Sequence, residues 1–141
     1  MKVTFALALN EENNFEKKHF GKSDKFAIYT STSNEISFTN EFPNIYKSVD
    51  EGQEHGSKTK GNAIISFLKE KGVSVLVSKQ FGQNINMVNQ HFIPVVIDEE
   101  KPEKVLEILN KHMDWIKDEL INRNENHMLF QIKNGIIKMH V

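Results

Sequence analysis

Three short segments contain the side chains best suited to binding a ligand. In the first, His19-Phe20-Gly21, an imidazole precedes a glycine that permits close approach of the backbone. The second, Glu54-His55-Gly56, repeats this pairing and is followed by Ser57. The third, Lys79-Gln80-Phe81-Gly82, combines a cation with another glycine. Two imidazoles, a lysine and backbone N–H groups favour an anionic or metal-containing ligand over a neutral one.

The apolar patterns around these segments predict strands that would hold them in place. Val3–Leu9 is almost continuously apolar, which is typical of a strand buried on both faces. Glu35–Thr39 alternates polar and apolar residues, as an edge strand does. Three further runs predict strands: Lys25–Thr30, Val73–Val77 and Phe92–Ile97. Pro94 lacks an N–H group and therefore predicts an edge position for the last of these.

Apolar residues at helical spacing predict three helices. The first opens at Gly56-Ser57 and ends at Gly72, with Ile64 and Leu68 in its buried stripe. Its lysines are expected to face solvent: Lys58, Lys60, Lys69 and Lys71. Asn84 can cap a short second helix. The third begins near Pro102 and continues as one helix to Leu120.

The C-terminal segment predicts a β-hairpin, because Asn134-Gly135 is the strongest short signal for a type I′ turn. A two-residue loop pairs Ile132 with Ile137, Phe130 with Met139, and Met128 with Val141, so that six apolar side chains share one face. The opposite face is polar, with Gln131, Lys133, Lys138 and His140. The apolar face needs a cover, since an isolated hairpin is marginally stable.

The order of these elements predicts an α/β fold. Right-handed crossovers give a five-stranded mixed sheet of spatial order 3-2-1-4-5, counted along the chain, plus the C-terminal hairpin. The segments that carry His19, His55 and Lys79 then emerge at one edge of the sheet, where open α/β sheets bind ligands. Helix N-termini near Ser57 and Asn84 would point at the same cleft.

Composition limits the function. The chain of 141 residues predicts one domain, 1–141, with a core over 1–122 and the hairpin 127–141 as an extension. The net charge of -1 argues against nucleic-acid or anionic-membrane partners. No run is long enough to cross a bilayer, and Val3–Leu9 is interpreted as a strand rather than a signal peptide. The absence of cysteine excludes disulfides and thiolate sites and fits a cytoplasmic protein.

The quoted segments resemble the dinitrogenase iron-molybdenum cofactor biosynthesis family. His19-Phe20-Gly21 with Asp24 and Phe26, Glu54-His55-Gly56, and Phe81-Gly82 resemble its three motifs, and the likeness spans about 1–109. The resemblance implies a ribonuclease H-like three-layer α/β/α fold and a role in binding or carrying iron–sulfur or iron–molybdenum cluster precursors. It implies His19 and His55 as metal contacts. It also implies that the following residues line the cofactor site: Phe20, Gly21, Gly56, Ser57, Lys79, Phe81 and Gly82.

The chain departs from the family in two ways. It lacks cysteine, which excludes thiolate ligation of a cluster within one chain, and it carries the C-terminal hairpin.

One predicted function is a non-enzymatic carrier of an anionic metallocofactor, with Glu54, Asp24 or Met87 supplementing the histidines. The alternative is a small-ligand or protein-partner module that uses the hairpin as an interface, including a homodimer. A nuclease is disfavoured because Lys2–Leu9 offers no carboxylate to hold divalent ions.

Overall fold

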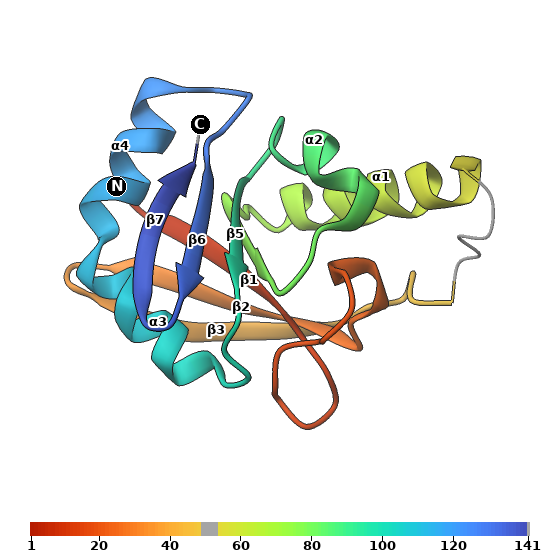
Figure 1. The fold of residues 1–141 in the computed structure, drawn as a ribbon, viewed down its shortest axis with the longest axis horizontal. Helices are drawn as coiled ribbons and strands as arrows, with labels where there is room; N and C mark the ends of the chain where they lie inside the picture. The colour runs from red at the N-terminus through yellow and green to blue at the C-terminus, as the bar shows by residue number, and fades with distance from the viewer. Residues whose placement is uncertain (49–53, 141) are drawn as a thin grey trace.

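A mixed β-sheet runs through the middle of the molecule, and helices cover both of its faces (Figure 1). The computed structural model describes residues 1–48 and 54–140, with only the backbone described for 54–57. The strands are β1 (Val3–Leu9), β2 (Lys25–Thr32), β3 (Glu35–Pro43), β4 (Val75–Ser78), β5 (Ile93–Ile97), β6 (Leu129–Lys133) and β7 (Ile136–His140). The helices are α1 (Glu54–Glu70), α2 (Ile85–Val88), α3 (Pro102–Lys111) and α4 (Met113–Asn122), with 3-10 turns η1 (Phe20–Lys22) and η2 (Gly82–Asn84).

Over the described residues the sheet has the order β3-β2-β1-β4-β5-β6-β7. β1 pairs antiparallel with β2 and parallel with β4, and parallel pairing continues through β5 to β6. The mixed α/β class is confirmed. The predicted count of five strands is wrong, because Val95 pairs with Phe130 and Ile97 with Ile132, so that the hairpin continues the sheet beyond β5.

Pro94 does not mark an edge of the sheet, contrary to the prediction. β5 lies between β4 and β6, and Pro94 itself is the partner of Leu76 in β4. Pairing with β6 begins only at Val95. Pro94, which has no N–H group, therefore precedes the first residue of β5 that pairs with β6. Its missing N–H group interrupts no hydrogen bond between these two strands. β3 is an edge strand, as its alternating pattern predicted.

Two apolar cores lie on the two faces of the sheet, and β1 contributes to both. Every residue of β1 is buried, as its continuous apolar sequence predicted. Leu7 belongs to the core that includes Val105 of α3, whereas Ala8 belongs to the core that includes Ile64 of α1. The alternation of strand side chains produces this division. None of the helices within the described ranges is long and apolar enough to span a membrane.

The helix predicted from Pro102 to Leu120 is two helices. α3 ends and α4 begins around His112, whose φ of -118° and ψ of 28° are not helical. The His112 ring contributes to this break, because its Nδ1 lies 2.9 Å from the carbonyl oxygen of Ile108. The apolar stripe continues across the break, with Leu109 and Ile116 both buried in the same core.

The hairpin forms as predicted. Asn134 and Gly135 have φ values of 52° and 78°, the left-handed conformation that a type I′ turn requires. The pairs Ile132 with Ile137 and Phe130 with Met139 are both present, while Val141 lies outside the described residues. Ile132 and Ile137 pack in the core that α3 and α4 complete, so these helices provide the cover that the apolar face needs.

Candidate functional site

His19 lies in the loop after β1 and caps the 3-10 turn η1. Its Nδ1 accepts a hydrogen bond of 3.2 Å from the Gly21 backbone N–H. The Lys22 N–H group donates to the carbonyl oxygen of His19 at 2.9 Å, which closes the turn. The His19 side chain is half-buried. One face of the turn therefore presents an imidazole whose orientation is set by its own backbone.

The loop after β4 lies directly beside this turn. Gln80 forms a parallel bridge with His19, and its carbonyl oxygen accepts from the Phe20 N–H group at 3.2 Å. A Cβ atom added to Gly82 would lie 3.5 Å from the Cβ of His19. Gly82 also has a φ of 63°, a conformation that favours glycine. The structure thus brings the first and third predicted segments together along the His19 ring.

Lys60 of α1 completes the described part of the site, and sequence reasoning placed it wrongly in solvent. Its side chain is only 1% exposed, and its Nζ donates to the Lys47 carbonyl oxygen at 2.9 Å. A Cβ atom on Gly21 would lie 3.2 Å from Lys60 Cε and 3.1 Å from His19 Nδ1. The burial of Lys60 could have been predicted from helical spacing, because residue 60 precedes the buried Ile64 and Leu68 by four and eight positions.

The remaining predicted residues fall into two groups. Phe20 and Phe81 are buried in the core on the α1 side, with ring centroids 5.8 Å apart, so their side chains pack beneath the loops rather than line the ligand site. Lys79 is half-buried, next to Gln80. The backbone of His55, Gly56 and Ser57 lies in the first turn of α1, but their side chains are outside the described residues, so the position of the second imidazole stays a prediction.

The predicted helix ends differ from those observed. α1 begins at Glu54 rather than at Gly56-Ser57. Asn84 precedes a helix of a single turn and makes no capping hydrogen bond through its side chain. It is instead buried against α1, since a Cβ atom on Gly61 would lie 2.7 Å from Asn84 Nδ2. Asn84 therefore helps to join α1 to the loop after β4.

A polar network holds the His19 loop. Asn44 Nδ2 donates to the carbonyl oxygens of Gly21 and Ser23, at 3.1 and 2.9 Å. Asp24 accepts from the Glu11 N–H group at 2.8 Å and pairs with Lys47. The hydrogen bond from Lys47 is the largest cause that lowers the pKa of Asp24 below its usual value. Asp24 therefore anchors the loop, and its role as a supplementary metal ligand stays a prediction.

The donor set does not make a closed metal site in the described part of the chain. Among residues whose side chains are described, no group of three or more histidines and carboxylates could hold a metal ion. The sequence contains no cysteine. A stable protein site for iron or zinc usually needs three or four ligands.

A comparison with protein-family models gives a family for this chain. A family model described as dinitrogenase iron-molybdenum cofactor matches residues 1–114. The chain belongs to this family. The match extends from β1 through α3 and includes the loops that carry His19 and Gly82, whereas the hairpin β6–β7 lies beyond it. No curated protein gives a match to the chain.

Proposed function

We propose that this protein is a non-enzymatic carrier in the cytoplasm for an iron–sulfur or iron–molybdenum cluster precursor, or for another anionic metallocofactor. The cluster is cargo, and it binds at the carboxyl edge of the parallel strands β1 and β4. The observation that carries the proposal is the convergence of His19, Gly21 and Gly82 with the buried Lys60. Membership of the iron-molybdenum cofactor family supports the same class of ligand.

Each part of the site has a chemical role in this proposal. The glycines leave room for the His19 side chain, since Gly21 and Gly82 both lie against it and a Cβ atom on Gly21 would crowd its ring. Lys60 lies buried beside Gly21, and its Nζ donates to the Lys47 carbonyl oxygen, so it joins α1 to the His19 loop. His55 belongs to the first turn of α1 by its backbone, and its role in binding is part of the proposal. The proposed architecture is ribonuclease H-like, with α1 and α2 on one face and α3 and α4 on the other.

Anaerobic reconstitution tests this function. The full chain is mixed with iron, sulfide and a small thiol that caps the cluster, and uptake is followed by visible absorbance and metal analysis after gel filtration. We expect uptake by the wild type, and a loss of most of it in the double variant His19→Ala, His55→Ala. His140→Ala is the matched control, because His140 lies on β7 and its ring bonds to Gln131 at 2.9 Å. No uptake by the wild type, or equal uptake by the double variant, would contradict the proposal.

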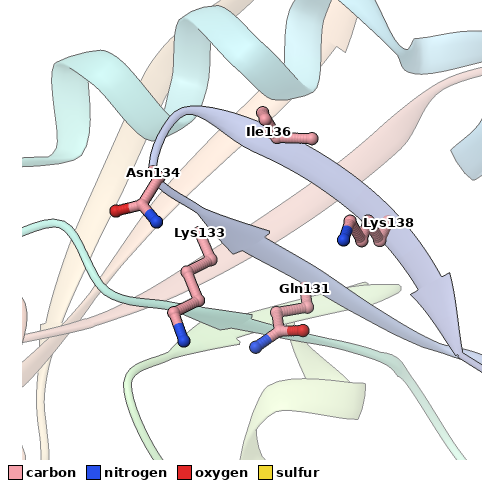
Figure 2. Close-up of a pocket in the computed structure, with 5 residues that line it drawn as sticks. All are labelled: Gln131, Lys133, Asn134, Ile136 and Lys138. Carbon is pink, nitrogen blue, oxygen red and sulfur yellow. The ribbon is translucent and has the colours of Figure 1, made fainter.

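A second candidate function uses the face of the hairpin that carries Gln131, Lys133 and Lys138. A hollow of about 140 Å³ lies on it, lined by Gln131, Lys133, Asn134, Ile136 and Lys138 (Figure 2). Ile136 is 60% exposed on β7, the strand at this edge of the sheet. Exposed apolar side chains on an edge strand favour pairing with another chain. We therefore propose homodimerisation through β7 as the alternative function of the hairpin.

Light scattering on the full chain distinguishes this alternative. A dimer that becomes a monomer in Ile136→Glu supports it, and a wild-type monomer at every concentration contradicts it. Ile121→Glu is the control, because Ile121 is similarly exposed, at 66%, but lies on α4. Cluster uptake and dimerisation are measured independently, so each proposal can fail alone.

A further inference from the structure

The outermost strand β7 has a free edge whose backbone groups can be assigned residue by residue. Because the hairpin turn has two residues, the residues that flank it form the first hydrogen-bonded pair, and such pairs alternate along an antiparallel ladder. Ile136, Lys138 and His140 therefore direct their N–H and C=O groups at β6. Ile137 and Met139 direct theirs to the other side, where no strand of the described ranges pairs with β7.

One face of the hairpin beside this edge carries positive charge. Lys138 of β7 and Lys133 of β6 lie on it with Gln131 (Figure 2). Among the described residues, no acidic side chain pairs with either lysine. A strand added to β7 would place every second side chain on this face, and the one opposite Lys138 would have its Cβ atom about 5 Å from that of the lysine. An acidic residue is therefore favoured at that position.

The other face beside the edge borders a groove between β7 and α4. The groove has a volume of about 300 Å³, and Trp115 and Met139, which line it, are 39% and 45% exposed. Arg123 also lines it but pairs with Glu119 at 2.6 Å, whereas Asp118 adds a carboxylate. An acidic side chain placed here would be repelled by Asp118, while an apolar one would cover Trp115 and Met139.

A second copy of β7 matches this edge less well than an acidic strand does. When two β7 strands pair antiparallel over 136–140, both outward residues form bonds only if Ile137 of each copy faces Met139 of the other. That register sets the two Lys138 side chains directly opposite each other, and like charges in this position are destabilising. Other registers leave part of the edge without backbone bonds.

We propose that the free edge of β7 binds an extended acidic segment of another protein, which adds one further strand to the sheet. Acidic residues of the segment lie beside Lys138, and the apolar residues between them cover Trp115. Bonds to the backbone of Ile137 and Met139 supply affinity, and the alternating side chains supply specificity. The inference is independent of the carrier function, and it names for the hairpin a partner other than a second copy.

The probe is a fluorescently labelled, capped peptide of alternating valine and glutamate, titrated into the full chain and followed by fluorescence anisotropy. A peptide of alternating valine and lysine is the matched control. We expect the acidic peptide to bind with a Kd below about 1 mM and the basic one at least about tenfold more weakly. Added salt should weaken the binding of the acidic peptide. No binding of the acidic peptide, or equal binding of both peptides, overturns the inference.

Two substitutions of Met139 test the backbone contact. Its N–H group points away from β6, so Met139→Pro removes a donor from the edge and leaves the ladder with β6 intact. Met139→Ala removes the same side chain but keeps the donor. We expect the proline variant to bind the acidic peptide at least about fivefold more weakly than the alanine variant, provided that circular dichroism shows both to be folded. Equal binding by the two variants overturns the inference.

Hydrogen exchange of the wild type provides a readout that needs no variant. The amides of Ile137 and Met139 should exchange more slowly when the acidic peptide is bound, because they become bonded to it. Unchanged exchange at both positions under saturating peptide overturns the inference.

A charge reversal tests the lysine. Lys138→Glu should weaken binding of the acidic peptide at least about tenfold and strengthen binding of the basic peptide. Lys104→Glu is the control, because Lys104 is also exposed but lies on α3, and it changes the net charge equally. If the control weakens binding as much as Lys138→Glu, the attraction is a general effect of net charge and the inference is overturned.

The inference and the other proposals fail differently. A wild-type dimer that excludes the acidic peptide and dissociates in Ile136→Glu overturns the inference and supports homodimerisation. Cluster uptake plays no part in the peptide experiments, so a failure of the carrier function leaves their outcome unchanged.

Discussion

The hairpin β6–β7 and the pair of loops around His19 are built from opposite kinds of contact. Within the hairpin, bonded partners are close in the chain, such as Gln131 and His140, which are 9 residues apart. Across the loop pair, Gln80 donates through its side chain to the Lys17 carbonyl oxygen over a separation of 63 residues. The hairpin depends on a local turn and alternation, whereas the loop pair depends on the crossover that brings β4 beside β1.

The two regions also differ in how closely they follow ordinary packing rules. The hairpin buries Phe130, Ile132 and Ile137, exposes its lysines together with Ile136 and Met139, and turns at Asn134-Gly135. The loop pair buries a lysine and brings two glycines against a histidine. Departures of this kind cost stability and are expected where a protein binds its ligand. The comparison predicts that changes in the hairpin alter folding and changes in the loops alter binding.

The largest expected effect is on the stability of the hairpin. Phe130 is completely buried in the core under α3 and α4, so Phe130→Ala should lower the free energy of unfolding by about 3–5 kcal/mol. Urea unfolding followed by circular dichroism measures it, with Lys138→Ala on the exposed face as the control. A loss below about 1 kcal/mol would mean that the hairpin is not part of the main core.

Gly21→Ala should affect both stability and binding. The added Cβ atom would lie 3.0 Å from His19 Cε1 and 3.2 Å from Lys60 Cε, so the ring or the lysine must move. We expect a loss of about 1–3 kcal/mol in the free energy of unfolding, as for other overpacked sites, together with weaker cluster uptake. Unchanged uptake in this variant would show that the orientation of His19 does not matter.

Gly135→Ala is the matched glycine change in the hairpin. Nothing lies within 4 Å of the added Cβ atom, but the φ of 78° is unfavourable for alanine. The expected cost is about 1–2 kcal/mol in unfolding free energy, with cluster uptake unchanged. Reduced uptake in the refolded variant would break the separation between the two regions, since Gly135 is remote from the loop pair in the sheet order.

The smallest expected effect is a pH dependence from Asp24. Its folded-state pKa is lowered, chiefly by the hydrogen bond from Lys47, so it stabilises the fold fully above its unfolded pKa of about 4. That contribution is lost as the pH falls from this value through the lower folded pKa. The urea concentration at the midpoint of unfolding should depend less on pH in Asp24→Asn than in the wild type, and only within this acid range. A profile parallel to that of the wild type would mean that the pair with Lys47 contributes nothing.

Much of the fold was predictable because it follows local patterns. The buried strand β1, the edge strand β3 and the hairpin register all follow from the two-residue period of side chains along a strand. The errors arose where a local signal has more than one outcome. Pro94 is compatible with an interior strand because it precedes the residues of β5 that pair with β6. His112 ends one helix, although the apolar stripe continues into the next helix.

The candidate site was less predictable. His19 and Gly82 were chosen from their residue types, and the crossover rule led to the expectation that their loops would meet. Lys60 was assigned to solvent because lysine is mostly exposed, although its position matches the buried stripe of α1. Phe20 and Phe81 were assigned to the ligand site from the family resemblance, and apolar burial draws their rings into the core.

The sequence by itself determined the strands, the turn at Asn134-Gly135 and the family, because these depend on periodicity, on backbone preferences of single residues and on short motifs. Only the tertiary structure decided that the hairpin extends the sheet, that Lys60 is buried beside Gly21, and that a backbone amide holds Nδ1 of His19. These features depend on contacts between segments far apart in the chain, and the position of a proton on an imidazole depends on which group faces it in space.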